Sequence, residues 1–173
     1  MRNLAKDPLM AGTRGLLAVL FWIFVVSGVL AILLAPVMAI NADMITANLE
    51  VKAEIAGEEV IDPRFLALTI FIGGVLMGVL AWFISMLRRI VATVAEGDPF
   101  VVENAQRLTR MGWLAVAIGV LATGIGIAAT LIDGSPEAFD IDGGSLILAL
   151  SLFILARVFR HGAALREDLE GTV

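Results

Sequence analysis

Three long segments of the chain contain no charged residue: residues 15–40, 65–87 and 111–132, which are 26, 23 and 22 residues long. A fourth uncharged segment, residues 143–156, has 14 residues. A helix needs about 20 apolar residues to cross the hydrocarbon core of a bilayer, where only internal hydrogen bonds can satisfy the backbone. The pattern therefore predicts an all-α membrane protein, a single domain of four transmembrane helices in an antiparallel bundle.

The fourth segment is too short to cross a bilayer as it stands, because 14 residues at about 1.5 Å each reach only ~21 Å. We therefore place the fourth span at residues 142–159, with Arg157 inside it. The long arginine side chain can keep its stem among the acyl chains while its guanidinium reaches the headgroups. The alternative is a buried Arg157 that takes part in a gated or ligand-binding pathway.

Lysine and arginine are unevenly divided among the segments outside the uncharged runs. Ten of them lie near the two termini or in the connection at residues 88–110: Arg2, Lys6, Arg14, Arg88, Arg89, Arg107, Arg110, Arg157, Arg160 and Arg166. The connections at residues 41–64 and 133–141 contain only Lys52 and Arg64. Because basic residues concentrate on the cytoplasmic side of membrane proteins, we expect both termini and residues 88–110 to lie in the cytoplasm.

The basic N-terminal segment followed by an apolar run also fits a signal peptide. The apolar core of a signal peptide has about 7–15 residues, whereas residues 15–40 form a run of 26 with no convincing small-x-small cleavage site. We therefore expect the first span to be retained as a transmembrane helix.

The connection at residues 41–64 contains a segment in which apolar and polar residues alternate. The alternation covers residues 49–55, and Gly57 offers a turn before the apolar pair at residues 60–61. A period of two is typical of a half-exposed strand, so we predict a small extracytoplasmic β-hairpin. An isolated hairpin is only marginally stable, and we expect this one to rest on the bundle or on a second copy of the chain.

The composition offers little material for catalysis. The chain is 60% hydrophobic and 17% charged, with a net charge of −5, one histidine and no cysteine. The absence of cysteine excludes disulfides, thiolate metal sites and thiol nucleophiles. No acids, bases or metal ligands have the spacing of a catalytic centre. We therefore predict no catalytic residue, no metal and no cofactor.

Two segments match known ligand-binding motifs by chance, if the chain spans the membrane as predicted. Residues 124–129 match the dinucleotide-binding pattern G-x-G-x-x-A, but that pattern needs a preceding strand and an aqueous site, and these residues lie inside an apolar span. Residues 140–143 resemble part of a calcium loop but lack its glycine spacing and its distal glutamate. Capping of the fourth helix by Asp142 is the simpler explanation.

Small residues recur four positions apart inside the spans. Gly74 precedes Gly78 by four, and Gly119 and Gly124 each precede another small residue at the same spacing. Such a pair opens a flat strip on a helix, where another backbone can approach closely. We expect these four glycines to pack helices within the bundle. Dimerisation through Gly74 and Gly78, giving a homo-oligomer, is the alternative.

The connection at residues 88–110 is predicted to form a structured elbow. The helical pattern of the second span continues from Arg88 to Glu96, and Gly97 offers a left-handed stop. Residues 98–99, Asp-Pro, form a turn. Asn104 is expected to cap the helix that leads into the third span.

The elbow also carries the residues of a family resemblance. Residues 97–100 read G-D-P-F, and E-N and a basic helix follow at residues 103–107. Together with four spans in this order, the segment resembles a bacterial family of small four-helix membrane proteins of unknown function, in which proline often stands where this chain has Val102. The resemblance implies a multi-pass protein of the bacterial cytoplasmic (inner) membrane. Genes of such families commonly lie beside a small Xre-type helix-turn-helix regulator, which implies a cytoplasmic regulator as partner.

Two sets of side chains are candidates for binding. The partner surface would comprise Asp98, Pro99, Phe100, Glu103, Asn104 and Arg107, with Phe100 as its apolar anchor. The alternative for Phe100 is packing against the end of the bundle. Lipid headgroups are expected to meet Arg88, Arg89, Arg157 and Arg160, because each basic residue near an anionic surface contributes about 1 kcal/mol.

The leading functional hypothesis is a non-enzymatic membrane protein that binds or sequesters a helix-turn-helix regulator and does not bind nucleic acid directly. A small transporter, or an efflux or immunity component, is the alternative. The absence of ionisable groups within the first three uncharged segments opposes this alternative. An enzyme acting at the headgroups ranks last, because no acid–base spacing supports it.

Overall fold

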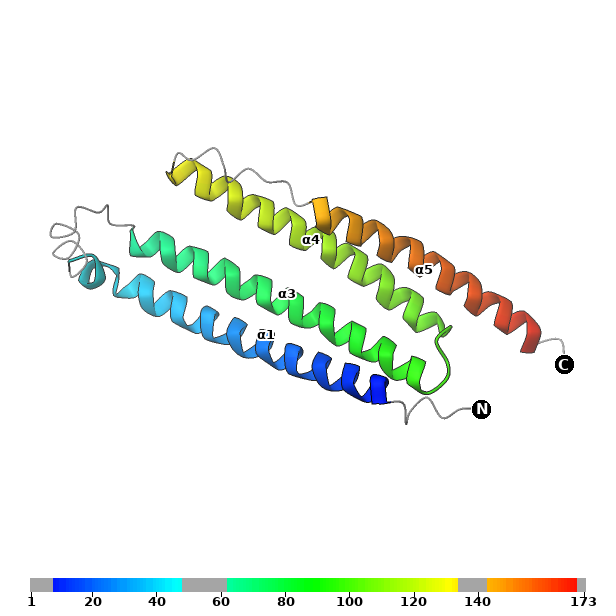
Figure 1. Cartoon of the computed structure of the whole chain (residues 1–173). Coiled ribbons are helices and arrows are strands. Elements are labelled where there is room, and N and C mark those ends of the chain that lie inside the picture. Colours follow the sequence, from blue (N-terminus) through cyan, green and yellow to red (C-terminus); the bar gives the residue numbers. More distant parts are fainter. Residues whose placement is uncertain (1–7, 48–61, 134–142, 171–173) are drawn as a thin grey trace. The chain divides into compact units, whose positions relative to one another are not determined.

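The computed structural model describes residues 8–47, 62–133 and 143–170, which form four long helices (Figure 1). They are α1 (Pro8–Ile40), α3 (Pro63–Ala95), α4 (Val102–Asp133) and α5 (Gly143–Glu170). Residues 42–47 add a short helix after α1. These described residues contain no strand, and the all-α prediction is confirmed. The hairpin predicted from residues 49–61, and Asp142 as a cap, lie outside them.

The helices have the length and surface of membrane spans. Among the residues that the structure describes, three segments are long and apolar enough to cross a bilayer: Met10–Ile40, Pro63–Ala95 and Gly143–Asp168. α4 contains the uncharged segment 111–132. Large apolar side chains are exposed along the helices, with Leu33 at 61%, Val120 at 67% and Ile147 at 69%. Such extensive apolar exposure fits contact with lipid. The chain is a multi-pass membrane protein.

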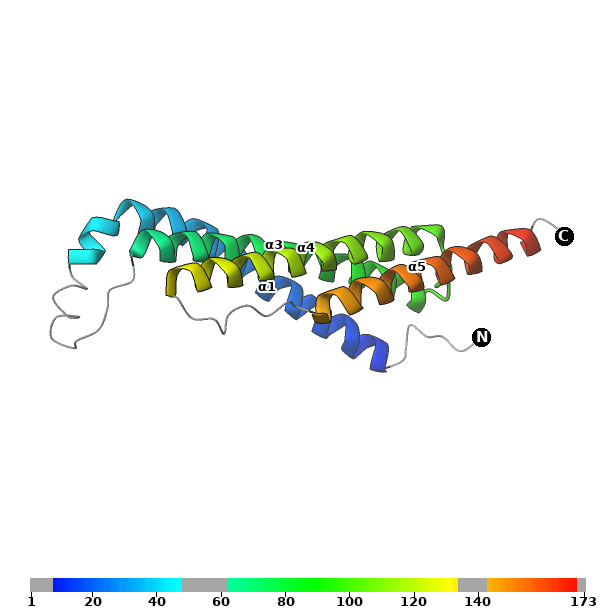
Figure 2. The ribbon, with the colours of Figure 1, turned by 90° about the horizontal axis from the view of Figure 1, so that it is seen from above.

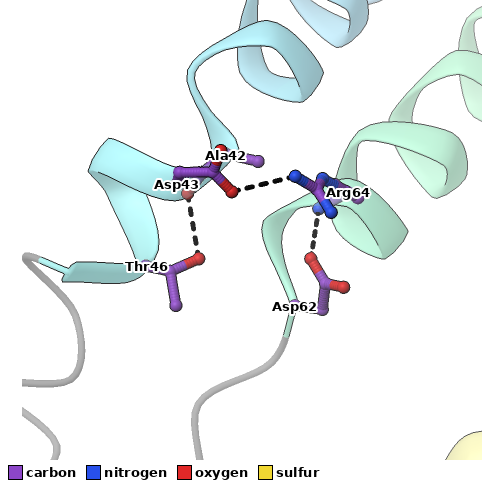
Figure 3. A network of polar contacts seen from close by, with 5 residues as sticks. All are labelled: Ala42, Asp43, Thr46, Asp62 and Arg64. Atoms are coloured by element: carbon purple, nitrogen blue, oxygen red, sulfur yellow. Dashed lines mark hydrogen bonds and ion pairs between the residues drawn. The ribbon is translucent and has the colours of Figure 1, made fainter.

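The chain divides into two compact units, and one of them is Trp22–Leu80. In this unit α3 begins with a capped turn, in which the Asp62 carboxylate accepts a 2.8 Å hydrogen bond from the main-chain N–H of Arg64. Proline at the first helical position, Pro63, suits such a start because its missing N–H is not needed there. The Arg64 guanidinium also donates to Asp43 at 2.8 Å, which joins the start of α3 to the short helix 42–47 (Figure 3).

The other unit contains α1 up to Phe21 and the chain from Ala81 onwards. Within it α4 and α5 run antiparallel and side by side in both views (Figures 1 and 2). α3, α4 and α5 all contribute to its apolar core: Met86, Ile90, Leu108, Met111, Ala115, Ala149, Leu152 and Ala156. The alanines among these residues allow close approach of helices. α5 continues beyond the predicted span as far as Glu170.

Candidate functional site

The part of the predicted connection that reverses the chain is residues 96–107, called the elbow from here on, and it begins with a glycine-terminated helix end. α3 ends at Ala95, and Gly97 has a φ of 91°. The Gly97 N–H donates to the carbonyl of Val94 at 3.1 Å, and the Asp98 N–H donates to that of Thr93 at 3.0 Å. These two bonds form a Schellman motif, whose left-handed residue is usually glycine. The predicted left-handed stop at Gly97 is confirmed.

The side chain of Asn104 joins the two sides of the elbow. Asn104 is 0% exposed. Its Nδ2 donates to the Thr93 hydroxyl at 2.7 Å and to the Pro99 carbonyl at 2.9 Å. Its Oδ1 accepts a 2.7 Å bond from the guanidinium of Arg107. One buried side chain therefore connects the end of α3, the turn and α4.

The prediction that Asn104 caps α4 is wrong. α4 begins at Val102, two residues earlier, and the Asn104 N–H donates to the carbonyl of Val101 at 3.0 Å. Val101 therefore occupies the cap position. Asn104 lies in the first turn, where its side chain satisfies buried polar groups of the elbow instead of the helix end.

Phe100 contacts α5. Its ring centroid lies 5.3 Å from that of Phe159, with the ring planes tilted by 48°. A Cβ added to Gly162 would lie 2.7 Å from Cδ1 of Phe100, so the glycine leaves the space that the ring occupies. Phe100 is nevertheless 41% exposed. The ring is thus packed on one side and accessible on the other.

An ion pair between Asp98 and Arg166 makes a second link from the elbow to α5. Both side chains are partly exposed, and pairs of this kind contribute little to stability, typically ~0–1 kcal/mol. Among the other candidate partner-binding residues, Pro99 and Arg107 take part in the hydrogen bonds of Asn104, and Glu103 is exposed. The elbow is therefore joined to α5 at two positions.

The four arginines predicted to meet headgroups lie in two places. Arg88 lies over the ring of Phe21, 5.1 Å from its centroid, which is a cation–π distance. Arg88 and Arg89 line a cleft of about 620 Å³ between α1 and α3. Arg157 and Arg160 line a different hollow of about 600 Å³ on α5. The two pairs of arginines therefore face different surfaces.

The predicted packing glycines differ in their surroundings. A Cβ at Gly74 would lie 2.9 Å from Cγ1 of Ile32 and 3.1 Å from the carbonyl oxygen of Gly28, so α1 and α3 approach closely there. A Cβ at Gly119 would lie 2.1 Å from Oγ of Ser145. Gly78 and Gly124 have nothing within 4 Å of such an atom.

Several contact residues were missed by the sequence analysis: Gly28, Thr93, Gly112, Phe159, Gly162 and Arg166. A Cβ at Gly112 would lie 2.7 Å from the Phe153 ring. Glycine inside a helix costs about 1 kcal/mol relative to alanine. The glycines at positions 112 and 162 could therefore have been interpreted as sites where another side chain approaches the helix closely. Thr93, Phe159 and Arg166 carried no such signal.

The elbow and the clefts beside it carry side chains that can bind anions. In residues 8–47, 62–133 and 143–170 there is no group of three or more His, Asp or Glu side chains that could hold a metal ion. The elbow and its clefts present guanidinium groups and hydrogen-bond donors. Such groups recognise carboxylates and phosphates.

In comparison with known proteins, the chain matches a family model described as a protein of unknown function, DUF2975, over residues 49–173. This region includes α3, α4 and α5. No curated protein and no solved structure matches the chain. The expectation of a family of unknown function is confirmed. Because the matched residues make up well over half of its length, the chain belongs to the DUF2975 family.

Proposed function

We propose that the chain is a non-enzymatic protein of the bacterial cytoplasmic membrane that binds or sequesters a helix-turn-helix regulator through the elbow and the adjoining end of α5. The observation that supports this most is the attachment of Phe100 and Asp98 to α5. Because the elbow is fixed in this way, a partner would meet one ordered surface and lose little entropy in ordering it.

The composition of this surface supports the proposal. Phe100 keeps 41% of its area exposed. Exposed charged residues of both signs lie close in sequence to Phe100 or to its α5 contacts, Phe159 and Gly162; they are Glu103, Arg160 and Glu167. A partly accessible aromatic side chain within a charged rim is typical of an interface anchor. The excess of basic residues near the termini and at residues 88–110 supports a cytoplasmic location for it.

Co-purification tests the proposal. The membrane protein is extracted in mild detergent and assayed for the product of an adjacent regulator gene. The unmodified chain should retain the regulator, and the variants Phe100→Ala and Asp98→Ala should retain less. Failure of the unmodified chain to retain any such regulator would refute the proposal.

A matched variant separates docking from packing. Phe159→Ala removes the ring against which Phe100 packs and leaves the elbow sequence intact. If Phe100 docks the partner, Phe100→Ala should lower retention more than Phe159→Ala does. Equal losses in the two variants would mean that the pair only supports the fold. Arg64→Ala, at the start of α3 on the side predicted to lie outside the cell, should leave retention unchanged.

A further inference from the structure

A cleft of about 190 Å³ lies between α3 and α4 beside the elbow. Its lining comes from one face of each helix, with residues at positions i, i+3, i+4 and i+7. The lining residues are Trp82, Ser85, Met86 and Arg89 of α3, and Glu103, Gln106, Arg107 and Arg110 of α4. The side chains that line the cleft come from two separate segments of the sequence, and the packing of α3 on α4 brings them together.

The cleft carries an excess of positive charge. Three arginines and one acidic residue, Glu103, line it. The ion pairs found among the described residues are Arg64–Asp43 and Arg166–Asp98. In that part of the chain, Arg89, Arg107 and Arg110 therefore have no ion-pair partner. Several guanidinium groups that line one cleft are suited to phosphate, which guanidinium can bind through paired hydrogen bonds.

One of the three guanidinium groups is held in place before any ligand arrives. Arg107 donates a 2.7 Å hydrogen bond to Oδ1 of Asn104, which is itself buried and bonded to Thr93. A guanidinium has five N–H donors, so others remain for a ligand. Preorganisation of this kind lowers the entropy lost on binding.

The position of the cleft along the helices corresponds to the headgroup layer. Arg89 follows the uncharged segment 65–87 by two residues, and Arg110 immediately precedes the segment 111–132. The cleft continues past these arginines to Met86 and to Trp82, which is 57% exposed. A charged end and an apolar end match the phosphate and the glycerol–acyl region of a lipid.

We infer that this cleft binds a phosphate group, supplied by the phosphodiester of an anionic phospholipid. Arg89, Arg107 and Arg110 hold the phosphate, and Trp82 contacts the acyl region. The negative Glu103 carboxylate would repel a ligand that carries two negative charges. A phosphodiester, which carries one, therefore suits the site better than a dianionic phosphate. Glu103 and Arg107 belong to both the elbow and the cleft, but the lipid experiment below uses no regulator, so its outcome does not depend on the proposed function.

Trp82 provides the readout. The full chain with Trp22→Phe and Trp113→Phe has Trp82 as its single tryptophan, and it is reconstituted in phosphatidylcholine vesicles. Quenching of Trp82 by acyl-brominated phosphatidylglycerol is compared with quenching by acyl-brominated phosphatidylcholine. We expect phosphatidylglycerol to associate preferentially. Each arginine removed, in Arg89→Gln and Arg110→Gln, should lower the relative association about fivefold.

A matched pair of variants controls for general surface charge. Arg157→Gln with Arg160→Gln removes the same charge from α5, outside the cleft, and should lower the quenching of Trp82 by brominated phosphatidylglycerol less than Arg89→Gln with Arg110→Gln does. Equal losses in both pairs would overturn the inference. Glu103→Gln should strengthen the preference, and this gain could not come from misfolding. No gain in this variant would count against the site.

Inorganic phosphate distinguishes a lipid from a soluble source. With a lipid in the cleft, millimolar phosphate should leave the quenching by brominated phosphatidylglycerol unchanged. A saturable change in Trp82 fluorescence with phosphate, abolished in the Arg89→Gln, Arg110→Gln chain and accompanied by no lipid preference, would overturn the lipid assignment.

Discussion

The side-chain amide of Asn104 donates a 2.7 Å hydrogen bond to the hydroxyl of Thr93, across the turn that reverses the chain between α3 and α4. The same hydroxyl donates to the carbonyl of Ile90 at 2.8 Å. A chain of hydrogen bonds therefore runs from the backbone of α3 through two side chains to Arg107 on α4. The shape of the elbow depends on one fully buried side chain.

Replacement of that side chain should destabilise the protein. In Asn104→Ala the Pro99 carbonyl and the Arg107 guanidinium lose their partner at a buried position, and we expect the free energy of unfolding to fall by about 1–3 kcal/mol. Thr93→Val removes one hydrogen bond of Asn104 and the hydroxyl's own bond to the Ile90 carbonyl. It should cost less, because the Pro99 carbonyl and the Arg107 guanidinium keep their partner. Titration with SDS in mixed micelles measures both. An Asn104→Ala loss no larger than that of Thr93→Val would contradict the role given to Asn104.

Gly74 and Gly78 should respond oppositely to alanine. A Cβ at Gly74 meets α1, including the backbone oxygen of Gly28 at 3.1 Å, so Gly74→Ala should force the helices apart and cost about 1–3 kcal/mol. Gly78 has open space, and Gly78→Ala should be neutral or stabilise the helix by up to ~1 kcal/mol. The two variants are compared by the same unfolding titration. A loss in Gly78→Ala similar to that in Gly74→Ala would indicate a second contact, such as a dimer.

Two interactions of Arg64 should differ in strength (Figure 3). Its guanidinium pairs with Asp43, but the two side chains are 63% and 91% exposed. A double-mutant cycle for this pair should give a coupling below ~1 kcal/mol that falls further in high salt. Asp62→Ala removes the cap of α3 and should cost about 1 kcal/mol. A larger loss in Asp43→Ala than in Asp62→Ala would reverse this ranking.

The helices and the elbow stop could be predicted from sequence because their causes are local. An uncharged run of 22 to 26 residues has few alternatives to a membrane helix, and Gly97 relieves a local steric constraint. The role of Asn104 could not be obtained in this way. Asparagine was assigned as a cap because that residue type is common just before a helix begins. Its actual hydrogen bond, to Thr93, forms only when α3 and α4 lie side by side.

The same limit applies to the binding residues. Arg107 was placed in the partner surface because it follows the elbow motif, yet it lines a cleft with Arg89 of another helix. Gly28 has no small residue four positions later, and its contact with Gly74 depends on how α1 packs on α3. Small residues four positions apart identify a helix surface that permits close approach, but they do not identify which helix packs on that surface.

The orientation in the membrane can be tested on a background that already lacks cysteine. Asp43 and Glu96 are exposed and lie in connections of opposite predicted sidedness. A membrane-impermeant maleimide should label the Asp43→Cys variant in intact cells and the Glu96→Cys variant only after permeabilisation, because the basic residues near Glu96 favour the cytoplasmic side. Both variants should react in detergent. Labelling of the Glu96→Cys variant in intact cells would place the elbow outside. It would remove the cytoplasmic regulator as a partner while leaving the phosphate cleft to be tested on the outer leaflet.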